Sequence, residues 1–173
     1  MKKPIYIFGS SIITQKTEFV NEYSEEVIQI MEDLKDSLYE GVGLSANQIG
    51  YNQSILIVKH PNAKTGTILI NPEIIEQAPE ISGEIEGCLS IPFTRVLIYR
   101  PTLVKVKYKN HLFEDCEEKF LPWFSRVVQH EMDHLNGLLM IDRFAGWLKV
   151  ISEGNLKLDY EYKIEKSNIL KLN

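Results

Sequence analysis

Apolar residues recur at helical spacing in residues 24–40, SEEVIQIMEDLKDSLYE. Intervals of three and four positions place five of them on one helix face: Val27, Ile30, Met31, Leu34 and Leu38. Ser24 is a good N-cap, and the two glutamates that follow it suit the positive end of the helix dipole. We expect this helix to stop at the glycines of GVGLSANQIG, which begin at Gly41.

A second helix is predicted over residues 121–137, LPWFSRVVQHEMDHLNG. Pro122 can occupy the first turn, where its missing N–H costs nothing, and Asn136-Gly137 is a typical helix end. Four apolar residues share the face that we expect to pack inward: Phe124, Val127, Val128 and Leu135.

Several shorter apolar runs predict strands. Residues 54–59 (SILIVK) and 67–75 (TILINPEII) are expected to be buried strands joined by a turn. In residues 102–109, valines and a tyrosine alternate with lysines, which indicates a half-exposed antiparallel strand. Residues 138–144 (LLMIDRF) are a candidate final strand. The polar stretch 146–173 indicates a weak helix or a frayed tail. The predicted class is α+β, with short antiparallel strands around a central helix.

The composition is that of an ordinary globular protein. The 173 residues suit one domain, and we expect a single catalytic domain over 1–173. A net charge of −5 gives no basic surface for nucleic acid or anionic membranes. No run approaches the ~20 apolar residues of a membrane span, and polar residues interrupt the N-terminal MKKPIYIFGSSIITQ too early for a signal peptide. With only two cysteines, we expect a reduced, cytosolic chain.

The stretch QHEMDHLNG, within the second predicted helix, contains the H-E-x-x-H pattern of metal hydrolases. At ~100° per residue, His130 and His134 lie only ~40° apart and one turn removed, so both rings can reach one cation. Glu131 falls beside them, where it can act on a water molecule. Two histidines leave a tetrahedral site half built, so other residues must complete it.

The residues alone leave the third ligand open. His60 precedes a proline and His111 lies in a turn-like segment, so both are more simply exposed loop residues. Glu153 could complete a site of two histidines and one glutamate, and Cys88 could complete a site of one cysteine and two histidines with an open fourth position. Cys116 lies among acidic residues that disfavour a thiolate, and we expect it to be structural.

Three blocks of sequence, in this order, resemble the peptide deformylase family. GVGLSANQ (residues 41–48), EGCLS (residues 86–90) and QHEMDH (residues 129–134) match its motifs GxGLAAxQ, EGCLS and QHExDH. The first block departs only at Ser45, where the family has alanine. The resemblance covers roughly residues 5–145 and implies a deformylase-like α+β fold with the metal on the central helix.

The resemblance implies a hydrolase that removes the N-formyl group from the initiator methionine of nascent peptides. Cys88, His130 and His134 would hold one divalent metal, usually Fe(II) in this family, with Zn, Ni or Co as substitutes. Glu131 would transfer protons. The Gln48 side-chain amide and the Leu89 backbone N–H would stabilise the developing oxyanion. The residues alone would have favoured zinc.

The same resemblance implies a substrate site. Gly43 would let the peptide backbone come close, and Val127 and Trp123 would line the methionine pocket, with Arg126 as a further candidate. The expected partners are N-formylmethionyl peptides, as nascent chains at the ribosome, and the expected location is the cytoplasm. A buried Glu86–Arg100 pair that orients the cysteine loop is a hypothesis.

The chain departs from the family in three places, one of which is the C-terminal stretch from about Phe144, which matches no family feature. Two rival functions are also open. Ser45 adds a hydroxyl beside Gln48, for which we expect mild effects, and Leu121-Pro122-Trp123 replaces the family's glycine-led helix start and could reshape the substrate groove. One rival is a metalloprotease with Glu153 as third ligand, which leaves EGCLS unexplained. The other is a retired relative that binds peptides without cleaving them.

Overall fold

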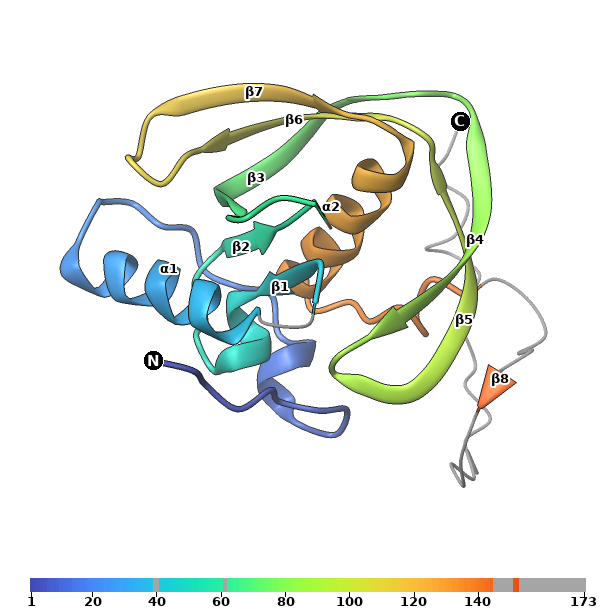
Figure 1. Ribbon diagram of the computed structural model, residues 1–173, viewed down its shortest axis with the longest axis horizontal. Coiled ribbons are helices and arrows are strands. Elements are labelled where there is room, and N and C mark those ends of the chain that lie inside the picture. Colours follow the sequence, from blue (N-terminus) through green and yellow to red (C-terminus); the bar gives the residue numbers. More distant parts are fainter. Residues whose placement is uncertain (39–40, 61, 145–150, 153–173) are drawn as a thin grey trace.

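The computed structural model describes residues 1–38, 41–60, 62–144 and 151–152. Two antiparallel sheets lie on either side of one helix, α2 (Pro122–Leu135), which occupies the centre of the molecule in Figure 1. The predicted α+β class with a central helix is therefore confirmed.

Helix α1 (Glu25–Ser37) covers one side of the larger sheet. Its start is as predicted, because the Ser24 hydroxyl accepts a hydrogen bond from the Val27 N–H. The helix ends before the glycines, since Leu38 has already left helical geometry (φ −85°, ψ 42°). Its apolar face packs on β2, β3 and the segment around β1, which together form one core cluster.

The larger sheet has the order β1-β2-β3-β6-β7, with every neighbouring pair antiparallel. Its strands are β1 (Gly43–Ser45), β2 (Ile55–Val58), β3 (Thr67–Gln77), β6 (Val104–Lys109) and β7 (Asp115–Phe120). The strands predicted at β2, β3 and β6 are present, and β2 is buried as expected. The burial predicted for β3 holds only for Ile68, Leu69 and Ile70, because the strand continues to Gln77 with its second half exposed. In β6 the two valines and Tyr108 are buried as their alternation indicates. Two short 3-10 helices, η1 (Ser11–Thr14) and η2 (Ala46–Ile49), precede α1 and follow β1.

The smaller sheet has the order β4-β5-β8 and is dominated by a long hairpin. Its strands are β4 (Ile81–Cys88), β5 (Ile91–Pro101) and β8 (Ile151–Ser152). The register shifts between Gly87, which pairs with Arg95, and Cys88, which pairs with Ile91. This irregularity ends β4 at the cysteine, beside the turn that joins the two strands.

Helix α2 joins the two halves of the molecule, contacting β1, β2 and β5. Pro122 lies in its first turn, and Gly137 follows the helix with a φ of +72°, both as predicted. Val127, Val128 and Leu135 are buried and Phe124 partly so. The helix thus forms part of the core and still carries the H-E-x-x-H residues.

The strand predicted for residues 138–144 is wrong. Its apolar residues Leu139 and Met140 are buried, but the backbone forms a turn in which the Asp142 N–H donates to the Leu139 carbonyl. The Asp142 carboxylate also accepts the Leu139 N–H at 2.7 Å, so the local side chain takes the bond that a strand would need. The helix or tail predicted for 146–173 lies outside the described residues, except that residues 151–152 are a strand.

Candidate metal centre

Three side chains converge between β4 and α2. Cys88, at the end of β4, meets His130 and His134 of α2, and one ligand atom from each lies within 4.8 Å of the others. The Cys88 Sγ lies 3.2 Å from the His134 Nε2. Both histidines are buried and the cysteine is half-buried. In the described part of the chain, no other three His, Cys, Asp or Glu residues place their ligand atoms this close together.

The local structure explains the convergence. The two histidines stand one helical turn apart, with ring centroids 5.1 Å from each other. The register shift at the tip of the β4–β5 hairpin brings the cysteine to the same place. His60 instead contacts the rings of Trp123 and Phe124, and His111 lies in a surface turn. Glu153, the rival ligand, lies outside the described residues.

Glu86 orients the first histidine. Its Oε2 lies 3.0 Å from the His130 Nδ1, which leaves the Nε2 of that ring free to face Cys88. Arg100 binds the same carboxylate twice, through Nε at 2.7 Å and Nη2 at 2.9 Å. Arg100 also donates to Asp133 at 2.8 Å. The hypothesised Glu86–Arg100 pair is therefore present and buried, and burial opposes the Glu86 charge while His130 and Arg100 lower its pKa to about 2.

The donor set fits a divalent transition metal. One thiolate and two neutral imidazoles are ligands of Zn²⁺ and its neighbours, and three protein ligands leave an open position, as in catalytic sites. Burial and the charge of His130 hold the pKa of His134 well below its usual value. For His130, burial also opposes a charge, but Cys88 and Glu86 outweigh it and raise the pKa to about 10. The negative groups that attract a proton there would equally attract a cation.

Glu131 is a buried carboxylate with an unpartnered oxygen. Its side chain is only 5% exposed, and among the described residues its Oε2 has no hydrogen-bond partner. Burial raises the pKa of Glu131 to about 7, against the opposing charges of His130 and Arg100. An unsatisfied buried carboxylate destabilises the fold, so it is typical of a functional position.

The Gln48 amide faces the cysteine. Its Nε2 lies 3.8 Å from the Cys88 Sγ and 3.0 Å from the Ser90 Oγ. The orientation is fixed by Ser45, whose backbone N–H and hydroxyl both lie 2.9 Å from the Gln48 Oε1. Because the carbonyl end of the amide is held by Ser45, the N–H₂ end must point toward the site. The added hydroxyl of Ser45 is thus part of the arrangement of Gln48.

Gly43 packs directly against Glu131. A Cβ at position 43 would lie 2.4 Å from the Glu131 Oε1 and 2.7 Å from its Cγ. The sequence suggested that this glycine makes room for a substrate backbone. The structure gives it a second reason, because only glycine leaves space for the carboxylate.

Replacing Gly43 with alanine should therefore push the Glu131 carboxylate out of place. We expect Gly43→Ala to lower kcat about 100-fold, since a misplacement of ~1 Å can cost that much. The change is measured as formate release from an N-formylmethionyl tripeptide, the activity that the sequence resemblance implies. Gly87→Ala is a matched control on the neighbouring hairpin, because a Cβ there would meet nothing closer than a carbonyl oxygen at 3.8 Å. Equal activity of Gly43→Ala and the parent would contradict the expected contact.

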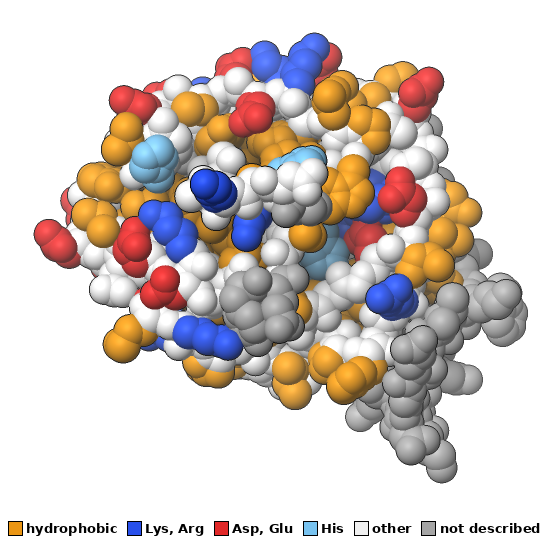
Figure 2. All heavy atoms as spheres, viewed as in Figure 1, with side chains coloured by type: hydrophobic (Ala, Val, Ile, Leu, Met, Phe, Trp, Pro, Cys, Tyr) orange, Lys and Arg blue, Asp and Glu red, His pale blue; other side chains and the backbone are white. Residues whose placement is uncertain are grey.

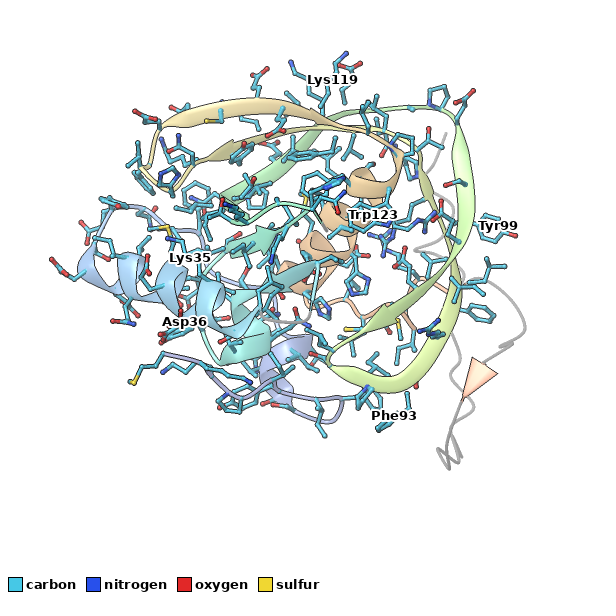
Figure 3. The ribbon with its side chains drawn as sticks, in the orientation of Figure 1. Lys35, Asp36, Phe93, Tyr99, Lys119 and Trp123 are labelled. Carbon is cyan, nitrogen blue, oxygen red and sulfur yellow. The ribbon has the colours of Figure 1, made fainter. Side chains whose placement is uncertain are left out.

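The other expected substrate residues lie around this site. Val127 is buried one turn before Glu131, whereas Trp123, a further turn away, is 42% exposed and lies near the start of α2 in Figure 3. Leu89 lies in the β4–β5 turn, with its side chain beside Gly41. Arg126 is buried and bonded within the protein.

Comparisons with known proteins agree with one another. The family model for polypeptide deformylase matches residues 2–149. Peptide deformylase from Pseudothermotoga lettingae is 38% identical over 170 residues, covering 92% of this chain and 98% of its own. The crystal structure of peptide deformylase from Thermotoga maritima superposes with a TM-score of 0.80 at 37% identity, covering 84% of this chain and 99% of that one. A Met-Ala-Ser-bound peptide deformylase from Acinetobacter baumannii gives a TM-score of 0.78 at 32% identity, covering 83% and 99%.

Proposed function

The chain belongs to the peptide deformylase family, and we propose that Cys88, His130 and His134 hold the metal with which it removes the formyl group of N-formylmethionyl peptides. It is a metal-dependent amide hydrolase that releases formate. The observation that carries the residue assignment is the convergence of these three ligand atoms beside a buried glutamate.

A divalent cation in such a site lowers the pKa of a water molecule to about 7 and polarises a carbonyl oxygen. The protein's own groups do the rest. Glu131 accepts a proton from the water that attacks the formyl carbon, and it delivers that proton to the departing amine nitrogen as the C–N bond breaks. The Gln48 amide and the Leu89 N–H donate to the formyl oxygen as negative charge develops there. Glu131 ends the reaction in the state in which it began.

Substrate binding is assigned to Gly43, Val127 and Trp123. Val127 is buried on the α2 face that carries Glu131, which suits the wall of an apolar pocket for the methionine side chain. Burying a Met side chain contributes roughly 1.5–3 kcal/mol, enough for selectivity but not for turnover. The A. baumannii relative was crystallised with Met-Ala-Ser bound, which supports a peptide substrate here.

We propose Fe(II) as the native metal on the resemblance, with Zn, Ni or Co able to replace it, and a single catalytic domain over 1–173. The substrates are nascent chains at the ribosome, and the enzyme acts in the cytoplasm. None of the helices in the described part of the chain has the length and apolar character needed to span a bilayer.

The test is formate release from an N-formylmethionyl tripeptide. The protein is purified anaerobically and loaded with Fe(II) or Ni(II), and the same peptide with an N-acetyl group is the control. Formate from the first peptide and no cleavage of the second establish deformylation. A folded, metal-loaded protein that releases no formate would overturn the proposal and favour the retired, peptide-binding relative.

A further inference from the structure

The Glu86 carboxylate is the meeting point of three nitrogen-bearing side chains. Besides the two bonds from Arg100 and the contact with the His130 Nδ1, its Oε1 accepts a hydrogen bond of 2.6 Å from the Arg126 Nη1. Arg126 and His130 are four residues apart on α2, so they present neighbouring side chains to the same carboxylate. All four side chains are buried.

Arg126 also ties three elements together. Its Nη1 donates to the Ile98 carbonyl of β5 at 2.9 Å. Its Nη2 donates to the carbonyl and hydroxyl oxygens of Ser82 in β4, at 2.8 and 3.0 Å. The guanidinium is planar and rigid, so bonds on both strands fix its plane and hold the nitrogen that faces Glu86 in place.

The two Glu86 oxygens have different hydrogen-bond partners. Arg126 and the Nε of Arg100 occupy Oε1, whereas His130 and the Nη2 of Arg100 occupy Oε2. Arg100 binds both oxygens, through its Nε and Nη2, and Arg126 adds a second bond on Oε1 only. With Arg126 on Oε1, the carboxylate cannot turn without losing that bond, and Oε2 stays directed at the histidine.

We propose that Arg126 is a positioning residue for His130, acting through Glu86 to hold the imidazole with its Nε2 toward Cys88 and His134. The inference rests on the metal site of the proposed function. It reassigns Arg126 from the methionine pocket, for which the resemblance made it a candidate, to the support of the metal ligands. Both Nη atoms of Arg126 already donate hydrogen bonds within the protein, to Glu86, Ser82 and the Ile98 carbonyl.

The experiment compares the metal affinity of Arg126→Met and Arg126→Lys with that of the parent. Chelator competition measures the affinity for Zn(II), and the visible absorption spectrum of the Co(II) protein reports the ligand geometry. Loss of such a supporting bond typically lowers metal affinity 10–100-fold, so we expect that decrease and an altered Co(II) spectrum for Arg126→Met. Arg126→Lys keeps a cation for Glu86 and should recover most of the affinity.

Two controls separate positioning from other roles. Ser82→Ala removes only the hydroxyl bond to Arg126. The bonds to the Ser82 and Ile98 carbonyls still hold the guanidinium, so the Zn(II) affinity should match the parent. Arg126→Gln serves as the neutral variant if Arg126→Met does not fold, with the same 10–100-fold loss expected.

Two outcomes would overturn the inference. One is a lower Tm with unchanged Zn(II) affinity and an unchanged Co(II) spectrum, which would make Arg126 structural only. The other is a higher KM for formylmethionyl peptides with unchanged metal binding, which would return Arg126 to the substrate pocket. Both readouts of metal binding are independent of turnover, so absence of deformylation in the parent would count against the proposed function and not against this inference.

Discussion

Glu131→Gln should remain folded, keep its metal, and lose about 10²–10⁴-fold in kcat. The amide has the size of the carboxylate, so it fits the space beside Gly43, but it cannot accept the proton of the attacking water. We expect little change in stability, because the substitution removes a buried carboxylate whose Oε2 has no hydrogen-bond partner among the described residues. The effect should therefore fall on kcat rather than on metal content.

Three measurements decide this prediction. Metal content per folded protein and Tm should match the parent, and formate release should nearly vanish. Glu32→Gln, an exposed glutamate of α1 far from the site, is the matched control and should keep full activity. If Glu131→Gln retained more than about a tenth of the parent kcat with bound metal, a proton acceptor other than Glu131 would have to be sought.

The helices were predictable because their signals are local. The N-cap at Ser24, the proline at position 122 and the Asn136-Gly137 end all act within one helical turn, so no knowledge of the rest of the fold is needed. The strands β2 and β6 were equally clear. One is a continuous buried run, and the other alternates valines with lysines.

The β4–β5 hairpin was not predicted, although it carries the cysteine. Its outer face bears exposed apolar residues, among them Ile81, Ile85 and Tyr99, so apolar and polar residues do not sort onto opposite faces. Hydrophobic side chains are visible on the surface along the right edge of Figure 2, and Figure 3 shows Phe93 and Tyr99 pointing away from the molecule. Glycines and glutamates along β4 weaken the strand signal further.

In the metal site, too, the residues that are close in sequence were predictable, whereas the contacts between distant residues were not. Helical periodicity places His130 and His134 together, but the approach of Cys88 depends on a hairpin register that no spacing rule supplies. The family resemblance named the cysteine where the residues alone left Glu153 open. Neither source indicated the contact of Gly43 with Glu131 or the bond from Arg126 to Glu86, because both depend on how separate elements pack.

Cys88→Ser should lower the affinity for Zn(II) by roughly 10²–10³-fold. The binding free energy of a zinc site with four ligands is about 10–16 kcal/mol, and we expect the loss of one ligand to remove about a quarter of it. A serine hydroxyl stays protonated at neutral pH and is a poor substitute for a thiolate. Chelator competition measures the affinity, and formate release should fall with the metal content. The fold should survive, since Cys88 lies half-buried at the end of β4 and the two residues have similar size.

Cys116→Ser is the matched control for this experiment. Cys116 is the other free cysteine, half-buried on β7 and not one of the three residues whose ligand atoms converge, so its loss should leave metal binding unchanged. The pair also separates the two enzyme classes raised by the sequence. Unchanged affinity in Cys88→Ser, together with metal loss in Glu153→Gln, would support a metalloprotease-type site. Metal loss in Cys88→Ser but not in Glu153→Gln requires the cysteine as third ligand. The metal centre would then depend on the β4–β5 hairpin, which carries Cys88, as well as on α2, which carries the histidines.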